Sequence, residues 1–244
     1  MVGETSYDSY QHWKGWAAAG FGVCGQADAA YFAVELSRSG IPDIRGVRIL
    51  ELGFGNGAFA GWAVQGEGIY TGVEAIPALV SLGRERGFDV SEAGHGLGEL
   101  TGLEAVDVVV AFDVLEHLEV PAIRSKLEEI HAVLKPNGLF IARLPSGDSP
   151  FARAVQHGDL THRSILGSSA MRQLGEWTGL SVEQVRAPAL PLTGLGMGAF
   201  LRRIVVLAGR AVTYPLISRL FMGGGSPVLS PNMIVVFRKR DAGR

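Results

Sequence analysis

The stretch "ILELGFGNGAF", residues 49–59, places three glycines between two apolar runs of different character. The first run, residues 47–52, is rich in leucine and β-branched side chains, which is typical of a buried parallel strand. The second run, residues 58–65, is expected to form a helix. Glycines let the backbone turn sharply and approach a ligand closely, and open α/β sheets bind ligands at the carboxyl ends of their strands. We therefore expect a ligand site at residues 53–57.

Further strands and helices alternate along the chain at the spacing of βαβ units. Helices are expected at residues 77–86, 121–134 and 169–179. The expected strands are residues 47–52, 69–75, 88–93, 106–112, 139–145, 180–187 and 232–239. With right-handed crossovers, these elements predict an α/β fold with a doubly wound, mostly parallel, seven-stranded sheet.

Composition and charge narrow the classes of partner. The formal net charge of −2 over 244 residues gives no general attraction for polyanions, so we expect no nucleic-acid partner. Cys24 is the only cysteine, which excludes an internal disulfide and a cysteine-cluster metal site. The sequence does not open with a basic segment followed by an apolar core, so no signal peptide is expected. These features favour a cytoplasmic location.

The glycine spacing and two acidic residues indicate which ligand the loop binds. Gly53, Gly55 and Gly57 are spaced GxGxG, whereas the dinucleotide fingerprint is GxGxxG, which weakens a nicotinamide interpretation. Glu74 ends the next strand, where a carboxylate can accept hydrogen bonds from ribose hydroxyls. Glu51, if partly exposed at its strand tip, can meet a cationic amino group. A ligand with a ribose and an ammonium group but no phosphate, such as S-adenosylmethionine, satisfies these features.

Four segments in order resemble the class I S-adenosylmethionine-dependent methyltransferases: "ELGFGNG", "GVEAIP", "FDVLEHL" and "LKPNGLFIARLPS", within residues 45–187. The resemblance implies a Rossmann-like methyltransferase fold. It places Glu51, Gly53, Phe54, Gly55 and Gly57 around the methionine part of the cofactor. It also places Glu74 and Ala75 at the ribose and Phe112 beside the sulfonium. In place of the family's acidic residue at the adenine, "AGHGLGEL" offers His95 and backbone groups.

We expect a single methyltransferase domain over residues 1–244. It divides into an N-terminal helical cap (1–46), a cofactor-binding core (47–187), a helical insertion (188–230) and the last strand (231–240). Within residues 195–222, four arginines and Pro215 interrupt the apolar runs, which argues against a membrane-spanning helix. The apolar face of this helix is expected to pack on the protein itself, on a second subunit in a homodimer, or peripherally on the inner face of a membrane.

"AFDVLEHL", residues 111–118, places three ionisable groups at the exit of the strongest strand. Three interpretations compete for Asp113, Glu116 and His117. In the first, Glu116 pairs with Arg143 or Arg163 and His117 fills a pocket. In the second, His117 is a general base, with Glu116 and His162 as further catalytic candidates. In the third, Asp113, Glu116 and His117 join His162 or His157 to bind a divalent metal ion, an arrangement similar to that of some small-RNA and ubiquinone-pathway methyltransferases.

The nearby histidines favour an oxygen nucleophile, because a hydroxyl must lose its proton as it is methylated. "GDLTHRS", residues 158–164, resembles a "DxTH" segment of bacterial methyltransferases associated with polysaccharide or glycolipid assembly. Indole rings in "YQHWKGW", residues 10–16, can stack on sugar rings. We therefore expect O-methylation of a sugar, polysaccharide or glycolipid. The alternatives are a small phenolic, quinone-like or other metabolite as the acceptor, or a cofactor-binding but inactive partner subunit.

Overall fold

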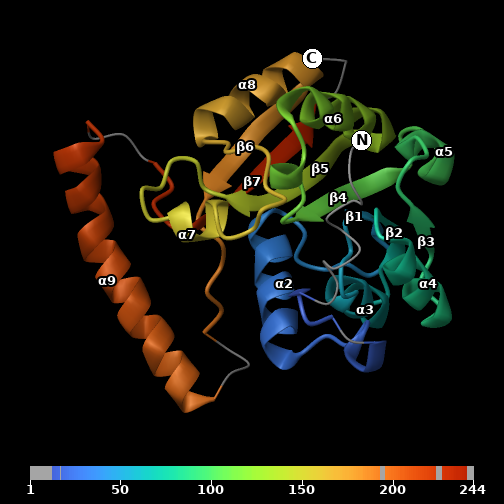
Figure 1. Cartoon of the computed structure of the whole chain (residues 1–244), viewed down its shortest axis with the longest axis horizontal. Helices are drawn as coiled ribbons and strands as arrows, with labels where there is room; N and C mark the ends of the chain where they lie inside the picture. The colour runs from blue at the N-terminus through green and yellow to red at the C-terminus, as the bar shows by residue number, and fades with distance from the viewer. Residues whose placement is uncertain (1–12, 17, 193–195, 224–226, 241–244) are drawn as a thin grey trace.

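A computed structural model describes residues 13–16, 18–192, 196–223 and 227–240, and it contains a seven-stranded sheet in the order β3-β2-β1-β4-β5-β7-β6 (Figure 1). All neighbouring strands are parallel except β7, which runs antiparallel to both β5 and β6. The strands are β1 (Arg48–Leu52), β2 (Ile69–Glu74), β3 (Val90–Glu92), β4 (Val106–Phe112), β5 (Leu134–Pro145), β6 (Leu180–Arg186) and β7 (Asn232–Lys239). The predicted α/β class and mostly parallel sheet are confirmed.

Helices cover both faces of this sheet. The helices of the described chain are η1 (Ala18–Gly20), α2 (Gln26–Arg38), α3 (Ala58–Gln65), α4 (Pro77–Glu85), α5 (Leu97–Thr101), η2 (Leu115–His117), α6 (Val120–Val133), α7 (Arg153–Gln156), α8 (Ser168–Thr178) and α9 (Met197–Phe221). Apolar side chains of α2, α3 and α4 form one core with one face of the sheet. Those of α5, α6 and α8 form a second core with the other face. The central strand β4 is buried between the two cores, which explains its continuous apolar sequence.

The largest departure from the predicted elements is at "KPNG", residues 135–138. The sequence predicts a turn there, with the strand starting at residue 139. In the structure β5 begins at Leu134, and its register against β4 shifts between Val106 and Val108. Asn137 adopts a left-handed backbone with φ of 63°. The turn residues therefore form an irregularity within the strand, because the neighbouring backbone still pairs on both sides of it.

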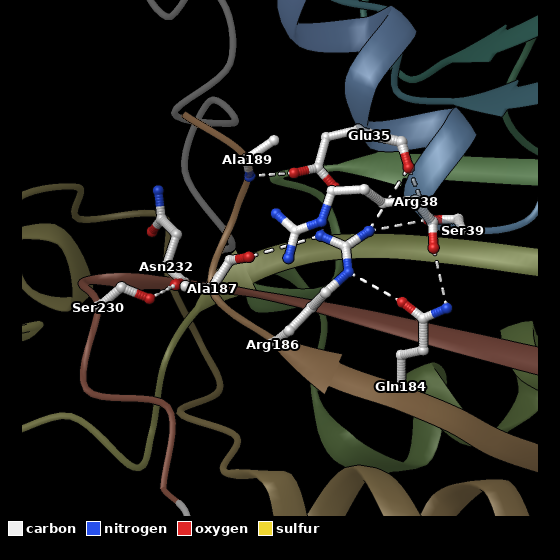
Figure 2. A network of polar contacts seen from close by, with 9 residues as sticks. All are labelled: Glu35, Arg38, Ser39, Gln184, Arg186, Ala187, Ala189, Ser230 and Asn232. Carbon is white, nitrogen blue, oxygen red and sulfur yellow. Dashed lines mark hydrogen bonds and ion pairs between the residues drawn. The ribbon is translucent and has the colours of Figure 1, made fainter. Parts of the chain in front are cut away.

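A buried polar network ties α2 to the end of β6 (Figure 2). The carboxylate of Glu35 is fully buried, pairs with Arg186 at 2.7 Å and accepts the backbone N–H of Ala189. Arg186 also donates to Ser39 Oγ at 3.0 Å, and Gln184 donates to the carbonyl of Arg38 at 3.0 Å. Breaking such a pair strands a buried charge, so this contact fixes the start of the insertion to the body of the protein.

The insertion before the last strand consists of α9, a single helix of 25 residues that stands apart from the body on the side where α7 lies (Figure 1). None of its described residues is buried. Pro215 lies inside this helix and does not end it. An 18-residue stretch of α9 has a mean hydropathy of 1.4, so this helix is long and apolar enough to cross a membrane by length and composition. The arginines and Pro215 therefore do not exclude a spanning helix in the way the sequence argument assumed.

Candidate active site

A cavity of about 350 Å³ opens at the carboxyl ends of β1, β2 and β4. Strand β1 has β2 on one side and β4 on the other, so the chain leaves β1 in one direction and later returns on its other side. Such a switch point is the usual ligand site of an open α/β sheet, because the loops diverge there. All eight predicted cofactor residues except Gly57 line this cavity.

The glycine loop has the backbone that its sequence predicts. Gly53 and Gly55 have φ values of 68° and 52°, a left-handed conformation that strains other residues. A Cβ atom on Gly53 would lie 2.6 Å from Val114, and one on Gly55 would lie 2.9 Å from Trp16. Gly57 caps α3 at its N-terminus and lies just behind the cavity lining. Space as well as conformation therefore requires glycine in the first two positions.

Glu74 holds the glycine loop against the neighbouring strand. Its Oε2 accepts the backbone N–H of Gly55 at 3.0 Å. Its Oε1 accepts the N–H groups of Ala75 at 2.7 Å and Ile76 at 3.1 Å. Burial raises the pKa of Glu74, and these three hydrogen bonds act in the opposite direction. The carboxylate is thus oriented before any ligand binds and borders the cavity, as predicted.

Glu51 also borders the cavity, but it is buried, whereas the sequence suggested a partly exposed strand tip. Its Oε2 accepts the hydroxyl of Tyr70 at 2.6 Å, a partner that the sequence analysis did not identify. Burial raises the pKa of Glu51 to about 8; the Tyr70 hydrogen bond lowers it and the charge of Glu74 raises it. A cation that entered the cavity beside Glu51 would favour its ionised form.

Phe112 forms an aromatic wall of the cavity and packs with Phe32 at a centroid distance of 5.8 Å. The guanidinium of Arg143 lies 5.3 Å from the Phe112 centroid. It makes two hydrogen bonds to Asp113, of 2.9 and 2.5 Å. Asp113 itself has a left-handed backbone, with φ of 59°, and its N–H bonds to the carbonyl of Arg143 at 2.9 Å. The arginine of this region therefore pairs with Asp113 and not with Glu116, which corrects the first interpretation of the cluster.

The opposite end of the cavity is bordered by the segment after β3. Ala93, Gly94 and His95 contribute to this end, together with Leu97 and Lys126. The His95 ring lies 3.8 Å from Glu99 and is mostly exposed. Backbone groups and an apolar side chain therefore dominate where the family places adenine.

His117 belongs to a hydrogen-bonded chain that ends at a carboxylate. Its Nδ1 lies 2.8 Å from the hydroxyl oxygen of Thr161, and that oxygen lies 2.5 Å from Oδ1 of Asp159. Burial raises the pKa of Asp159, but the hydrogen bonds from Thr161 and the charge of Lys14, 3.4 Å away, outweigh it and lower this pKa to about 2. The ionised carboxylate can only accept, so the single hydroxyl proton of Thr161 points to Asp159. Thr161 therefore accepts from Nδ1–H of His117, and Nε2 carries the lone pair.

A second histidine stands beside the first. The rings of His117 and His162 have centroids 4.8 Å apart, and Nδ1 of His162 lies 3.0 Å from the carbonyl oxygen of Gln156. Because a carbonyl only accepts, Nδ1 of His162 carries a proton, and in the neutral form of this ring Nε2 is the nitrogen with the lone pair. Burial and the neighbouring His162 lower the pKa of His117, so its ring is neutral near pH 7.

Glu116 completes a group that could hold a metal ion. Ligand atoms of Glu116, His117 and His162 lie within 4.8 Å of one another. Glu116 is buried, and no donor among the described residues bonds its Oε2. Burial and the charge of Asp113 raise the pKa of Glu116. Arg163 pairs with Glu119 instead, at 3.5 Å, so among the described residues neither predicted arginine forms an ion pair with Glu116, although the charge of Arg143 acts to lower its pKa.

The structure corrects two members of the predicted metal set. Asp113 is outside the group, because Arg143 engages both of its oxygens. His157, the alternative distal histidine, is also outside it. Between β4 and α6 the chain forms only the short 3-10 helix η2, and this turn buries Glu116.

Backbone contacts bring the two halves of this cluster together. The carbonyl of Glu116 accepts the N–H groups of Arg163 at 2.7 Å and Ser164 at 3.1 Å. The hydroxyl of Ser164 donates to the carbonyl of Leu118 at 2.6 Å. These contacts align "DLTH" with "LEH", so the roles of Asp159 and Thr161 become visible only in the folded chain. The sequence signal was the "DxTH" segment, from which we had selected only the histidine.

The strand order and the cavity at the carboxyl ends of β1, β2 and β4 define a doubly wound α/β protein with a ligand site at its switch point. Residues 50–142 match a family model described as a methyltransferase domain. No curated protein sequence matches the chain.

Solved structures show the same fold. A SAM dependent methyltransferase from Archaeoglobus fulgidus is 15% identical, with a TM-score of 0.62, and the match covers 96% of this chain and 100% of that chain. An S-adenosylmethionine dependent methyltransferase from Mesorhizobium loti is 16% identical, with a TM-score of 0.58, covering 88% of this chain and 100% of the other. The 1,6-didemethyltoxoflavin-N1-methyltransferase of Burkholderia thailandensis, solved with S-adenosylhomocysteine, is 17% identical, with a TM-score of 0.55, covering 96% and 84%.

The chain therefore contains a methyltransferase domain, matched within residues 50–142, and it has the fold of these solved structures.

Proposed function

We propose that this protein transfers the methyl group of S-adenosylmethionine to a hydroxyl oxygen of a sugar, polysaccharide or glycolipid acceptor, with His117 as the general base. The observation that carries this proposal is the Asp159–Thr161–His117 chain at the edge of the cofactor cavity. An amine or thiol nucleophile needs less help with its proton, whereas a hydroxyl benefits from a positioned base.

The cavity lining supports one orientation of the cofactor. Glu74 would accept a ribose hydroxyl, and the segment from Ala93 to Leu97 would flank the adenine. The methionine part would lie along the glycine loop with its ammonium group toward Glu51. This orientation directs the sulfonium toward Phe112, whose ring face can stabilise a cation. The transferable methyl then lies at the end of the cavity that His117 borders.

The reaction is an in-line displacement in which the protein mainly aligns the two reactants. The acceptor oxygen forms a bond to the methyl carbon as the carbon–sulfur bond breaks, and the electron pair stays on sulfur to give S-adenosylhomocysteine. His117 Nε2 takes the hydroxyl proton and later releases it to solvent. Thr161 and Asp159 hold the imidazole in the tautomer that makes this possible and stabilise the imidazolium that forms. Good alignment can contribute about 7–11 kcal/mol of barrier reduction.

Polar groups at the acceptor end of the cavity suit a hydroxyl-rich acceptor. Lys14, the Asp113–Arg143 pair and His117 all border this end, and they offer both donors and acceptors. Trp16 packs over the glycine loop at the same cavity, and Trp13 is more than half exposed nearby in sequence. Of the predicted aromatic segment, Tyr10, Gln11 and His12 lie outside the described residues. A cytoplasmic protein acting on an acceptor at the inner face of the membrane fits this assignment.

A divalent metal ion at Glu116, His117 and His162 is the second candidate, and the residues fit it. The buried Oε2 of Glu116 has no donor among the described residues, and both histidines place Nδ1–H against an oxygen. Histidine ligands in metal sites are commonly oriented in this way. The ion would supply Lewis acidity at the acceptor oxygen. Because the same Nε2 of His117 cannot serve as ligand and base together, the two roles are exclusive.

Two measurements test the proposal. In the first, purified protein is incubated with tritiated S-adenosylmethionine and a panel of hydroxylated sugars, glycolipids and simple phenols, and the labelled product is characterised. Label on nitrogen, or transfer to phenols alone, would contradict the sugar assignment. The second compares turnover before and after exhaustive chelation. Full activity without metal and a loss of at least about 100-fold in His117→Ala support the base, whereas loss on chelation with recovery on added metal supports the ion.

A further inference from the structure

We propose that α9 docks in the plane of an anionic membrane, with its axis parallel to the surface, and holds the open edge of the active site against the lipid. This goes beyond the proposed methyl transfer and does not depend on the identity of the acceptor. In this proposal α9 contacts the lipid directly, without a partner protein.

The surface of α9 is too apolar for a helix that faces only water. Five of its side chains recur at spacings of four or seven residues and fall within about 100° of one another on a helical projection. Each is more than half exposed: Met197, Leu201, Val205, Val212 and Leu216. We call these five residues the apolar stripe. A contiguous exposed stripe of this kind marks a contact with lipid or with another protein.

The charge of this region favours anionic lipid. Between Glu183 and Asp241 the sequence contains no acidic residue, although the whole chain has a net charge of −2. Arg202, Arg203 and Arg210 lie within about 100° of one another, Arg202 near the edge of the apolar stripe and the other two on the opposite side of the helix, where Arg203 also donates to the carbonyl of Pro191. Arg219 is in the last turn, within the sector of the stripe, where a long side chain can extend toward headgroups. Arginines on the face opposite an apolar stripe are typical of helices that lie on anionic membrane surfaces.

The attachment of α9 at both ends excludes a spanning orientation. Ala189 is buried and hydrogen-bonded to Glu35, and Val228 is buried with its carbonyl accepting the hydroxyl of Ser146 at 2.7 Å (Figure 2 shows the first of these contacts). Both points belong to the same folded body. From Phe221 to Val228 the chain advances seven residues, which reach at most about 25 Å when extended.

A helix spanning the bilayer would place Phe221 beyond a hydrocarbon core about 30 Å thick. The chain would then have to cross back through lipid as extended backbone with unsatisfied hydrogen-bonding groups, which does not occur. The length and hydropathy of α9 allow a span, but the two attachments permit only a helix on the surface.

The same attachments place both ends of α9 at the edge of the sheet where the cavity opens. Strand β6 ends, and the antiparallel β7 begins, at the edge where the parallel strands present their carboxyl ends. The cavity opens at this edge, and α7, which follows β5, lies between the sheet and α9 (Figure 1). A membrane-bound α9 therefore brings the cavity edge close to lipid-linked molecules.

Vesicle flotation tests the proposal with the full chain. Wild type should float with vesicles of phosphatidylcholine and phosphatidylglycerol mixed three to one, and should float much less with phosphatidylcholine alone or at high salt. Val205→Glu combined with Val212→Glu should reduce the bound fraction at least about tenfold, because both side chains are in the apolar stripe. Leu103→Glu introduces one such negative charge at an equally exposed site on the body and should leave binding unchanged, whereas Val205→Glu alone, with the same change of charge, should already weaken it.

Two further measurements separate the alternatives. With Cys24→Ser as background, single cysteines at Gly196 and Gly223 should both react with a membrane-impermeant maleimide outside sealed vesicles. Protection of either one would show a spanning helix. Light scattering reports a second copy as the occupant: a dimer that the Val205→Glu, Val212→Glu variant converts to a monomer, together with no flotation, overturns the proposal. Cofactor affinity measured on the same variants shows that they are folded and separates failure of docking from failure of the methyltransferase assignment.

Discussion

Substituting Glu74 by glutamine tests whether this carboxylate holds the cofactor ribose. A carboxylate has about four lone-pair positions, and three of those of Glu74 already accept N–H groups of Gly55, Ala75 and Ile76. The remaining position, on Oε2, is the one available to a ribose hydroxyl. In Glu74→Gln the amide oxygen can still accept from Ala75 and Ile76, but the –NH₂ group then opposes the N–H of Gly55 and cannot accept from the ribose.

The expected loss of affinity follows from this geometry. One hydrogen bond to a charged group contributes about 1.5–3 kcal/mol, so the Kd for S-adenosylmethionine should rise about 10- to 150-fold. Isothermal titration calorimetry with S-adenosylhomocysteine and with S-adenosylmethionine measures it, and thermal unfolding without ligand shows whether the variant is folded. Glu92→Gln is the matched control, because Glu92 lies opposite Glu74 in the register of β3 but is exposed and outside the cavity lining.

The result that would refute this reasoning is a folded Glu74→Gln variant with the wild-type Kd. It would show that the ribose lies elsewhere, and the orientation of the cofactor would have to be abandoned. Equal losses of cofactor affinity in Glu74→Gln and Glu92→Gln would also contradict the ribose contact. The two variants share only the removal of one negative charge, so the loss would then be a general effect of charge.

Three further predictions follow from individual contacts. Thr161→Val should lower kcat about 10- to 100-fold with little change in the KM for the cofactor, whereas Thr161→Ser should keep the wild-type kcat. If steady-state assays give Thr161→Val the same kcat as wild type, the hydrogen-bonded chain has no part in the mechanism. Glu51 has a folded pKa of about 8 against an ordinary 4.5, so its stabilising contribution is full below pH 4.5 and is lost as the pH rises through 8. Urea unfolding of Glu51→Gln should therefore show a flatter pH dependence than wild type across that window, and identical profiles would contradict the assignment. Gly53→Ala should destabilise the protein by about 2–5 kcal/mol, because the left-handed backbone is strained with a Cβ and because that Cβ overlaps Val114. In a double-mutant cycle, Val114→Ala should recover only the part of the unfolding free energy that is lost to the overlap. Additive effects of the two substitutions would show that the two side chains do not meet.

The sequence was informative wherever the physical cause is local. Continuous apolar runs, helix-forming stretches between them and glycines after the first strand depend on neighbours along the chain, and they predicted the sheet, its helices and the loop of Gly53 and Gly55. The position of Glu74 at the end of the neighbouring strand was predicted from the same local patterns. A weak point was "KPNG", whose residues favour a turn although neighbouring strands hold them in β5.

The choice of charged partners could not be read from the sequence. Asp113, Glu116 and His117 are neighbours in the chain, yet Arg143 engages only the first, and the last bonds Thr161, which is 44 residues away. Which of these pairs form depends on the loops that adjacent strands bring together. The burial of Glu51 and Glu116 could not be predicted either, because it depends on side chains from other strands and helices.

The sequence by itself thus determined the class of fold and the glycine loop, since these depend on short-range patterns and backbone conformation. Only the tertiary structure decided that Asp159 and Thr161 orient His117, and that α9 is attached to the body at both ends. Composition allows α9 to span a bilayer, whereas the reach of seven residues does not; this limit arises from where β6 ends and β7 begins in the folded sheet.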